Sequence, residues 1–238
     1  MQITKLQCGL RLALLALVVL SVSILQWQVR PALSQTVSKR KLIAVIDPGH
    51  GGYDPGKIGI TGEIEKDLNL QIALLTKQFL EANDCIVYLT RTEDISLKDA
   101  NASNQKVSDL KNRLQLILDT KADIFISIHQ NSFTSPKEHG AQVFYQEDSK
   151  EGELLATILQ DTLVRELDSS NRRVCKSSDN YYLLTHASCT ALIIECGFLS
   201  NPKEALLLKD PTYQKKLAYS ISLGIRTWWL SEQSTNPQ

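Results

Sequence analysis

The sequence predicts an α/β fold, in which one twisted, mostly parallel sheet is flanked by helices within a single domain. Short apolar runs typical of buried strands alternate along the chain with longer segments whose apolar residues recur at helical spacing. A length of 238 residues with 43% apolar content suits one globular domain of ordinary size plus a short terminal extension. The sequence contains no repeats and no low-complexity segment.

The predicted elements follow in order from residue 41. A continuous apolar run at 42–46 predicts a first buried strand, which Asp47-Pro48-Gly49 ends. Apolar residues at helical spacing predict a helix over 65–82. Further strands are expected at 86–89, 124–128, 141–145 and 191–194, and further helices at 107–119, 151–167 and 211–230. The domain should therefore span 41–231, followed by a disordered tail at 232–238.

The first 40 residues have a different character. Residues 12–25 are apolar except for two serines and follow cations, which is typical of an export segment. This run is shorter than the roughly 20 residues of a membrane-spanning helix, and small residues at 32–34 offer a cleavage site. Trp27 and Arg30 would equally anchor a retained helix. We expect residues 1–40 to be a signal peptide or an N-terminal membrane anchor plus linker, and the protein to be exported.

The charge of the predicted domain argues against one class of partner. The first 40 residues contain five Lys or Arg and no Asp or Glu, so 21 cations face 26 carboxylates in the remainder. Nucleic-acid binding normally relies on clustered Lys and Arg that neutralise phosphates. We therefore expect no nucleic-acid partner.

Four cysteines follow the first 40 residues. Cys85 and Cys196 lie within apolar strand-like runs, where a cysteine usually acts as a small buried hydrophobe. Cys175 and Cys189 could form a disulfide in an oxidising compartment, although their spacing does not require one.

Three side chains suited to metal binding or acid–base chemistry lie at the ends of predicted strands: His50, His129 and Glu195. In open α/β sheets, ligands bind outside the carboxyl ends of the strands, so we expect these groups to meet there. A carboxylate within an apolar strand is costly unless it is paired or functional. A buried salt bridge is the structural alternative for Glu195.

Glu65 lies in the first turn of the predicted helix and is a further candidate. A carboxylate there also complements the helix macrodipole, and Glu63 and Asp67 compete for the same role. The glycine pair Gly51-Gly52 either lets the backbone pass close to a ligand or forms a tight structural turn. Asn131 falls on the same side of its strand as the preceding histidine and could support the site by hydrogen bonding.

These motifs resemble those of the zinc-dependent N-acetylmuramoyl-L-alanine amidases of the amidase-3 type, over about residues 41–229. The resemblance implies a zinc amidase fold with one zinc ion per chain, bound by His50, Glu65 and His129, and Glu195 as the catalytic residue. It selects Glu65 over Glu63. The matched text is Asp47-Pro48-Gly49-His50-Gly51-Gly52, Glu65-Lys66-Asp67, Thr90-Arg91, Arg113, Ser127-Ile128-His129-Gln130-Asn131 and Glu195-Cys196-Gly197-Phe198-Leu199-Ser200-Asn201-Pro202.

The resemblance implies hydrolysis of the amide between the lactyl group of N-acetylmuramic acid and L-alanine in peptidoglycan. Two histidines and one glutamate leave one zinc position open for water, as in catalytic sites, and Glu195 would transfer the proton. Arg113 and Tyr182 are expected to support the site or to contact substrate. A groove is expected between 132–139 and 180–183, whose tyrosines either pack against sugars or fill the edge of the core.

Within the family, the similarity is greatest to members that act on the spore cortex of endospore formers. This implies a role in muramic lactam formation needed for germination, at the outer face of the cytoplasmic membrane, in the cell wall or in the forespore intermembrane space. A downstream muramic acid deacetylase and an accessory lipoprotein would be partners, and the protein should be a monomer. The alternatives are a vegetative amidase for cell separation or lysis, another zinc hydrolase such as a carboxypeptidase or polysaccharide deacetylase, and a non-enzymatic wall-binding module.

Overall fold

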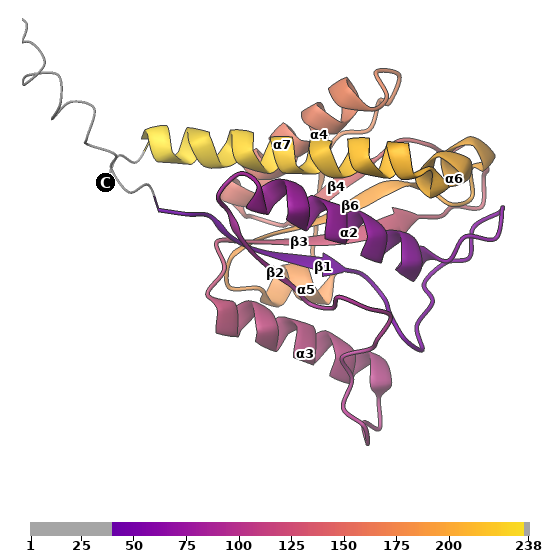
Figure 1. The fold of residues 1–238 in the computed structure, drawn as a ribbon, viewed down its shortest axis with the longest axis horizontal. Coiled ribbons are helices and arrows are strands. Elements are labelled where there is room, and N and C mark those ends of the chain that lie inside the picture. The colour runs from indigo at the N-terminus through magenta and orange to yellow at the C-terminus, as the bar shows by residue number, and fades with distance from the viewer. Residues whose placement is uncertain (1–39, 236–238) are drawn as a thin grey trace, which may run out of the picture. The chain divides into compact units, whose positions relative to one another are not determined.

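The computed structural model describes residues 40–235, in which six strands form one sheet in the order β2-β1-β3-β6-β4-β5 (Figure 1). All neighbouring strands are parallel except β4 and β6, which are antiparallel. The predicted α/β class with a mostly parallel sheet is confirmed. The strands are β1 (Ile43–Pro48), β2 (Ile86–Leu89), β3 (Ile124–Asn131), β4 (Gln142–Gln146), β5 (Lys176–Ser178) and β6 (Thr190–Phe198).

Helices cover both faces of the sheet. In Figure 1, α2, α4, α6 and α7 lie on one side of the strands, and α3 and α5 lie on the other. This explains why β1, β3 and β6 are apolar without alternation, since both of their faces are buried. The helices are α2 (Glu65–Glu81), α3 (Gln105–Thr120), α4 (Lys150–Glu166), α5 (Tyr182–His186), α6 (Pro202–Lys209) and α7 (Pro211–Thr235).

Local signals in the sequence account for the helix ends. The Asn104 side chain accepts a hydrogen bond from the backbone of Val107 and so caps α3, and Lys121 ends that helix in the left-handed conformation. Asn201 caps α6 in the same way, with Pro202 at its first position. Helix α7 packs against α2 and α4 through apolar residues that recur at helical spacing. The buried ones are Leu217, Ile221, Ile225 and Trp228.

Several predicted boundaries differ from the structure. Strands β3 and β6 continue past residues 128 and 194 to Asn131 and Phe198. Helix α7 runs to Thr235, so the predicted tail cannot begin before residue 236, and 236–238 lie outside the described residues. The elements β5, α5 and α6 were not predicted.

The cysteines occupy separate environments. All four are free in the described chain. Cys175 and Cys189 are both partly buried, and they pack against the core clusters on opposite faces of the sheet. A disulfide between them is therefore not supported. Cys196 is buried as predicted, whereas Cys85 is only partly buried because it precedes β2 rather than lying within it.

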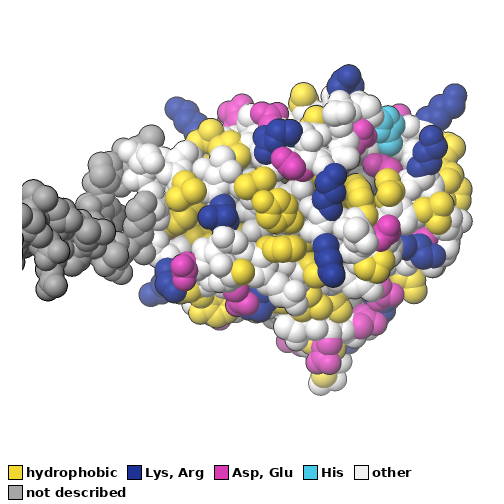
Figure 2. Space-filling view, turned by 45° about the horizontal axis from the view of Figure 1, so that its top comes forward, with side chains coloured by type: hydrophobic (Ala, Val, Ile, Leu, Met, Phe, Trp, Pro, Cys, Tyr) yellow, Lys and Arg dark blue, Asp and Glu magenta, His cyan; other side chains and the backbone are white. Residues whose placement is uncertain are grey.

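The surface shows no basic patch in the view of Figure 2, where cations and carboxylates are interspersed among apolar side chains. Among residues 40–235, no helix combines the length and the apolar composition of a membrane span. The leader predicted for 1–40 falls outside the described residues except for its last position.

Candidate active site

Three side chains from separate elements converge at the carboxyl end of the sheet. His50 follows β1, Glu65 opens α2, and His129 lies in β3; their potential ligand atoms all fall within 4.8 Å of one another. The Glu65 carboxylate is central, because its Oε1 lies 3.2 Å from Nε2 of His50 and 3.0 Å from Nδ1 of His129. The structure thus brings together the three residues expected to bind zinc.

The two competitors of Glu65 lie elsewhere. The Glu63 carboxylate is buried against the Thr61 hydroxyl and the Lys209 ammonium, so it links the loop before α2 to helix α6. Asp67 is exposed to solvent. Neither belongs to the cluster of potential metal ligands.

The imidazole of His50 is oriented by a carboxylate that the sequence had not singled out. Nδ1 of His50 lies 2.8 Å from Oδ2 of Asp54, which turns Nε2 toward Glu65. Burial disfavours the charged ring, but hydrogen bonds and charge interactions with Glu65 and Asp54 outweigh it and raise the pKa of His50 to about 9. Asp54 is itself held by the backbone N–H of Gly56. A carboxylate behind a histidine is a common support for metal ligation.

Glu65 is fixed on both of its oxygens. Oε1 accepts a hydrogen bond from the backbone N–H of Gln130, and Oε2 accepts one from the backbone N–H of Lys57. Burial opposes its charge, but the neighbouring histidines outweigh burial and hold the pKa of Glu65 well below its usual range. The carboxylate is therefore ionised, as a metal ligand must be.

Two glycines allow this close approach, and they are not the predicted pair. A Cβ at Gly49 would lie 2.2 Å from the His129 ring, and one at Gly56 would lie 2.6 Å from Oε2 of Glu65. Gly51 and Gly52 instead adopt positive φ in a turn that packs against the backbone at 95–96. The tight-turn interpretation of Gly51-Gly52 is correct, and the expectation that they face the ligand was wrong.

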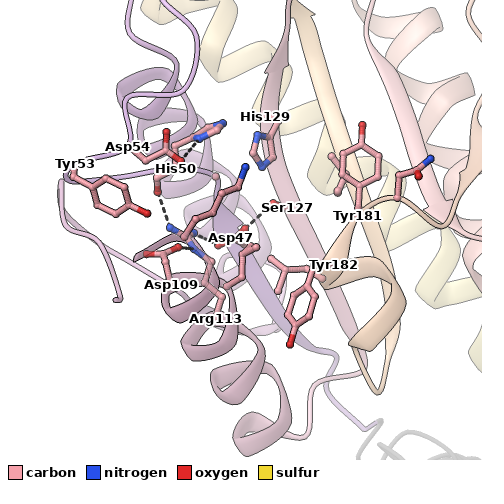
Figure 3. A pocket seen from close by; sticks show the side chains of 16 residues that line it. Asp47, His50, Tyr53, Asp54, Asp109, Arg113, Ser127, His129, Tyr181 and Tyr182 are labelled. Carbon is pink, nitrogen blue, oxygen red and sulfur yellow. Dashed lines mark hydrogen bonds and ion pairs between the residues drawn. The ribbon is translucent and has the colours of Figure 1, made fainter. Parts of the chain in front are cut away.

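A buried ionic network supports the segment that carries His50 (Figure 3). Asp47 forms an ion pair with Arg113 and accepts hydrogen bonds from Ser127 and Thr90, which together outweigh burial and lower the pKa of Asp47. Arg113 also donates to the backbone carbonyl of His50 at 2.6 Å. Its guanidinium thus holds the His50 backbone.

A second buried guanidinium acts on the same segment. Arg91 donates to the backbone carbonyls of Pro48 and Gly49 at 3.0 and 3.1 Å, and to the carbonyl of Lys66 at 2.8 Å. Arg91 belongs to the matched Thr90-Arg91 motif, whose sequence alone indicates no role for it. It ties the loop after β1 to the first turn of α2.

Glu195 stands beside the cluster without a partner of its own. Its Cα pairs with that of His129 across β3 and β6, and no residue that the structure describes forms a hydrogen bond with its buried Oε2. Within residues 40–235 it forms no salt bridge, so the buried-salt-bridge alternative is wrong. Burial, together with the charge of Glu65, outweighs the nearby histidines and raises the pKa of Glu195 to about 6.

The neighbours of Glu195 have different surroundings. The Cys196 thiol is buried on the opposite side of β6, within the core, and contacts the backbone carbonyl of Ile194. It does not face the metal ligands. Asn131 lines a cavity beside Glu195, and its side-chain oxygen accepts from the backbone N–H of Ser132.

Two cavities adjoin the cluster and share the side chains of His50, Asp54 and Lys106. We call the first, of about 310 Å³, the tyrosine cavity, because Tyr53, Tyr181 and Tyr182 line it (Figure 3). The second, of about 390 Å³, is the polar cavity, and the residues that line it alone are Gly56, Lys57, Glu65, Gln130, Asn131, Ser132 and Glu195.

The prediction of a groove between 132–139 and 180–183 is correct for one of its two walls. Residues 180–183 line the tyrosine cavity, with the Tyr182 ring stacked on His186 at 4.2 Å between centroids. The opposite wall comes from α3 and the loop after β1 rather than from 132–139. Asn201 donates to the carbonyls of Pro136 and Glu138 and so draws that loop toward α6, leaving only Ser132 at the polar cavity.

Comparisons with known proteins agree on one family. Residues 44–227 match the family model described as N-acetylmuramoyl-L-alanine amidase. The chain is 38% identical over 200 residues to the germination-specific N-acetylmuramoyl-L-alanine amidase of Bacillus subtilis, covering 82% of this chain and 83% of that protein. It is 30% identical over 187 residues to the probable cell wall amidase LytH of Staphylococcus aureus, covering 78% of this chain and 57% of LytH.

Solved structures show the same relationship. The CwlD amidase from Clostridioides difficile, solved in complex with the GerS lipoprotein, superposes with a TM-score of 0.78 at 38% identity. The match covers 80% of this chain and 100% of that chain. All four candidate site residues fall within the segment that the family model matches.

Proposed function

Because the chain belongs to the N-acetylmuramoyl-L-alanine amidase family, we propose that it hydrolyses the lactyl–L-alanine amide of peptidoglycan with one zinc ion held by His50, Glu65 and His129. The observation that carries the proposal is the convergence of these three side chains within 4.8 Å beside the unpaired carboxylate of Glu195.

The donor set suits zinc. Two imidazoles and one carboxylate are typical of catalytic zinc sites, which keep a position open for water or substrate. The buried, partnerless oxygen of Glu195 also fits a site that holds a further polar group in the working enzyme. When bound, zinc supplies Lewis acidity that polarises the substrate carbonyl and lowers the pKa of water toward about 7.

The residues of the chain transfer the proton and position the metal ligands. Glu195 takes the proton of the attacking water and returns it to the leaving amine of L-alanine. A pKa of about 6 suits both steps, since the carboxylate is ionised at neutral pH yet still basic enough to accept a proton. Asp54 and Arg113 hold the ring and the backbone of His50 in place.

We extend the proposal to the spore cortex. Support comes from the 38% identity to the germination-specific enzyme over 83% of its length, against 30% identity to LytH over 57% of its length. Removing the peptide leaves a bare muramic acid, which a downstream deacetylase and lactam closure can then use. The complex of CwlD with a lipoprotein supports an exported protein with an accessory lipoprotein partner. A vegetative wall amidase is the second candidate, favoured by the likeness to LytH.

Digestion of purified peptidoglycan tests the chemistry. The zinc-loaded protein should release stem peptides with free N-terminal L-alanine. Glu195→Gln should lose on the order of 10²- to 10⁴-fold in turnover while retaining zinc, and Glu147→Gln, at an exposed position, should behave like the parent. New reducing sugars, or shortened peptides without free L-alanine, would indicate a different hydrolase. Full activity of Glu195→Gln would contradict the proposed role of that residue, and an inactive parent would favour a binding module.

A complementation experiment tests the biological role. The gene would be expressed during sporulation in Bacillus subtilis that lacks its germination-specific amidase. Restored muramic lactam in the cortex is the expected result. A protein that digests peptidoglycan in vitro but leaves the cortex without lactam would favour the vegetative alternative.

A further inference from the structure

The polar cavity is lined by two lysines together with the carboxylates of Asp54, Glu65 and Glu195, and Lys106 interacts electrostatically with Asp54. The carboxylates of Asp54 and Glu65 are engaged with the histidines. Lys57, in the loop before α2, and Lys106, in the first turn of α3, also line this cavity. Neither ammonium forms a salt bridge with any residue that the structure describes. Two exposed lysines that line one cavity from separate elements are suited to an anion.

The tyrosine cavity differs in chemistry. Three tyrosines, two leucines and Ile193 contribute to its lining, and its second cation, Arg113, is buried and paired with Asp47 and Asp109. Only the polar cavity is lined by both lysines. Because the metal ligands adjoin both cavities, a substrate cleaved there would place one half on each side. Sugar rings suit the tyrosines, and a charged peptide suits the lysines.

We propose that Lys57 and Lys106 bind a carboxylate of the stem peptide, so that the peptide occupies the polar cavity and the glycan the tyrosine cavity. This rests on the proposed amidase function. In peptidoglycan the residue after L-alanine is D-glutamate joined through its γ-carboxyl, which leaves its α-carboxylate free close to the scissile amide. Some peptidoglycans carry an amide at that position. The lysines thus make the enzyme select stems with the free acid.

Paired substrates test this inference. Two muramyl peptide fragments would be used, identical except that the α-carboxyl of D-glutamate is free in one and amidated in the other. Release of N-terminal L-alanine gives kcat and KM for the full chain loaded with zinc. The parent should show a KM about fivefold lower for the free acid, the size expected of an exposed ion pair, with kcat unchanged.

Matched variants test whether the two lysines cause the preference for the free acid. Lys106→Gln and Lys57→Gln should each reduce the preference, the double variant should abolish it, and Lys106→Arg should keep it. Lys111→Gln, an exposed lysine five positions later on α3, should leave it intact. Equal KM values for the two substrates in the parent, or a preference that survives in the double variant, would overturn the assignment. Failure to release L-alanine from either substrate would instead contradict the amidase function.

Discussion

The two histidines of the site reach the same carboxylate by different means. His129 lies in β3 between β1 and β6: it pairs with Glu195 of β6, and the pairing of β3 with β1 extends to the preceding residue, Ile128, so the sheet fixes its backbone. His50 lies beyond the end of β1 with a φ of 62°, in the left-handed region that few residues other than glycine adopt. Arg113 holds its carbonyl and Asp54 holds its ring. A ligand on a strand is positioned by the sheet, whereas a ligand on a loop needs dedicated side chains.

Removal of either imidazole should have the largest effect. His50→Ala and His129→Ala should each reduce the zinc content from about one ion per chain to near zero, with turnover at background, because two ligands do not retain the metal. Elemental analysis of dialysed protein and peptidoglycan digestion would measure both. Exposed His139 provides the control as His139→Ala. Zinc retained by only one of the two variants would show that the histidines do not share one ion.

Loss of the buried guanidinium of Arg113 should have the second largest effect. Arg113→Met leaves the Asp47 carboxylate buried without its ion-pair partner, which should lower the free energy of unfolding by about 3–5 kcal/mol. Denaturant unfolding of the metal-free protein would measure this, with exposed Arg165→Met as the control, expected to cost less than about 1 kcal/mol. Equal losses in the two variants would show that the network does not support the loop.

A smaller change should follow from altering the support of the His50 ring. Asp54→Asn removes the negative charge behind Nδ1 and should weaken zinc binding by about 10- to 100-fold. Asn131→Ala, two residues from the strand-borne ligand, should change zinc affinity less, since β3 already fixes His129. Competition with a chelator would measure both affinities. A larger loss for Asn131→Ala would reverse the comparison between loop and strand.

The dependence of turnover on pH should give the most gradual effect. The folded protein raises the pKa of Glu195 to about 6, so the fraction in the basic, proton-accepting form falls as the pH drops through that value. The positive charge of zinc would favour the ionised carboxylate. The decline of turnover on the acidic side of the pH profile should therefore be centred at or below about pH 6. Turnover should then fall about tenfold per pH unit below that pH. If turnover already declines at a pH well above 6, the titrating group is not Glu195.

Regular elements of the fold were predictable because long apolar patterns are local. The strand at 43–48 and helix α2 can each be predicted from the pattern of their own residues. Elements of three and five residues, β5 and α5, are too short to show a period. Helix α6 has a cap signal at Asn201, but its run of consecutive apolar residues lacks helical spacing. The reversed direction of β4 depends on its partner strand and cannot be seen in its sequence.

The site was predictable only where a residue's position followed from strand ends. His50, His129 and Glu195 come from that rule. Asp54 lies in a loop whose path depends on the left-handed turn at His50, so its contact has no signal in the sequence. The close approach of Gly49 to the His129 ring joins residues 80 positions apart and is set by the register of β1 against β3.

The inward orientation of Cys196 has a consequence for how the enzyme ages. Its thiol stands next in sequence to the catalytic carboxylate, yet it is sealed in the core, and burial raises its pKa far above that of a free cysteine. Alkylating agents and peroxides react with accessible thiolates, and this sulfur is neither accessible nor ionised. The thiol next to the catalytic carboxylate therefore needs no reductant to stay unmodified.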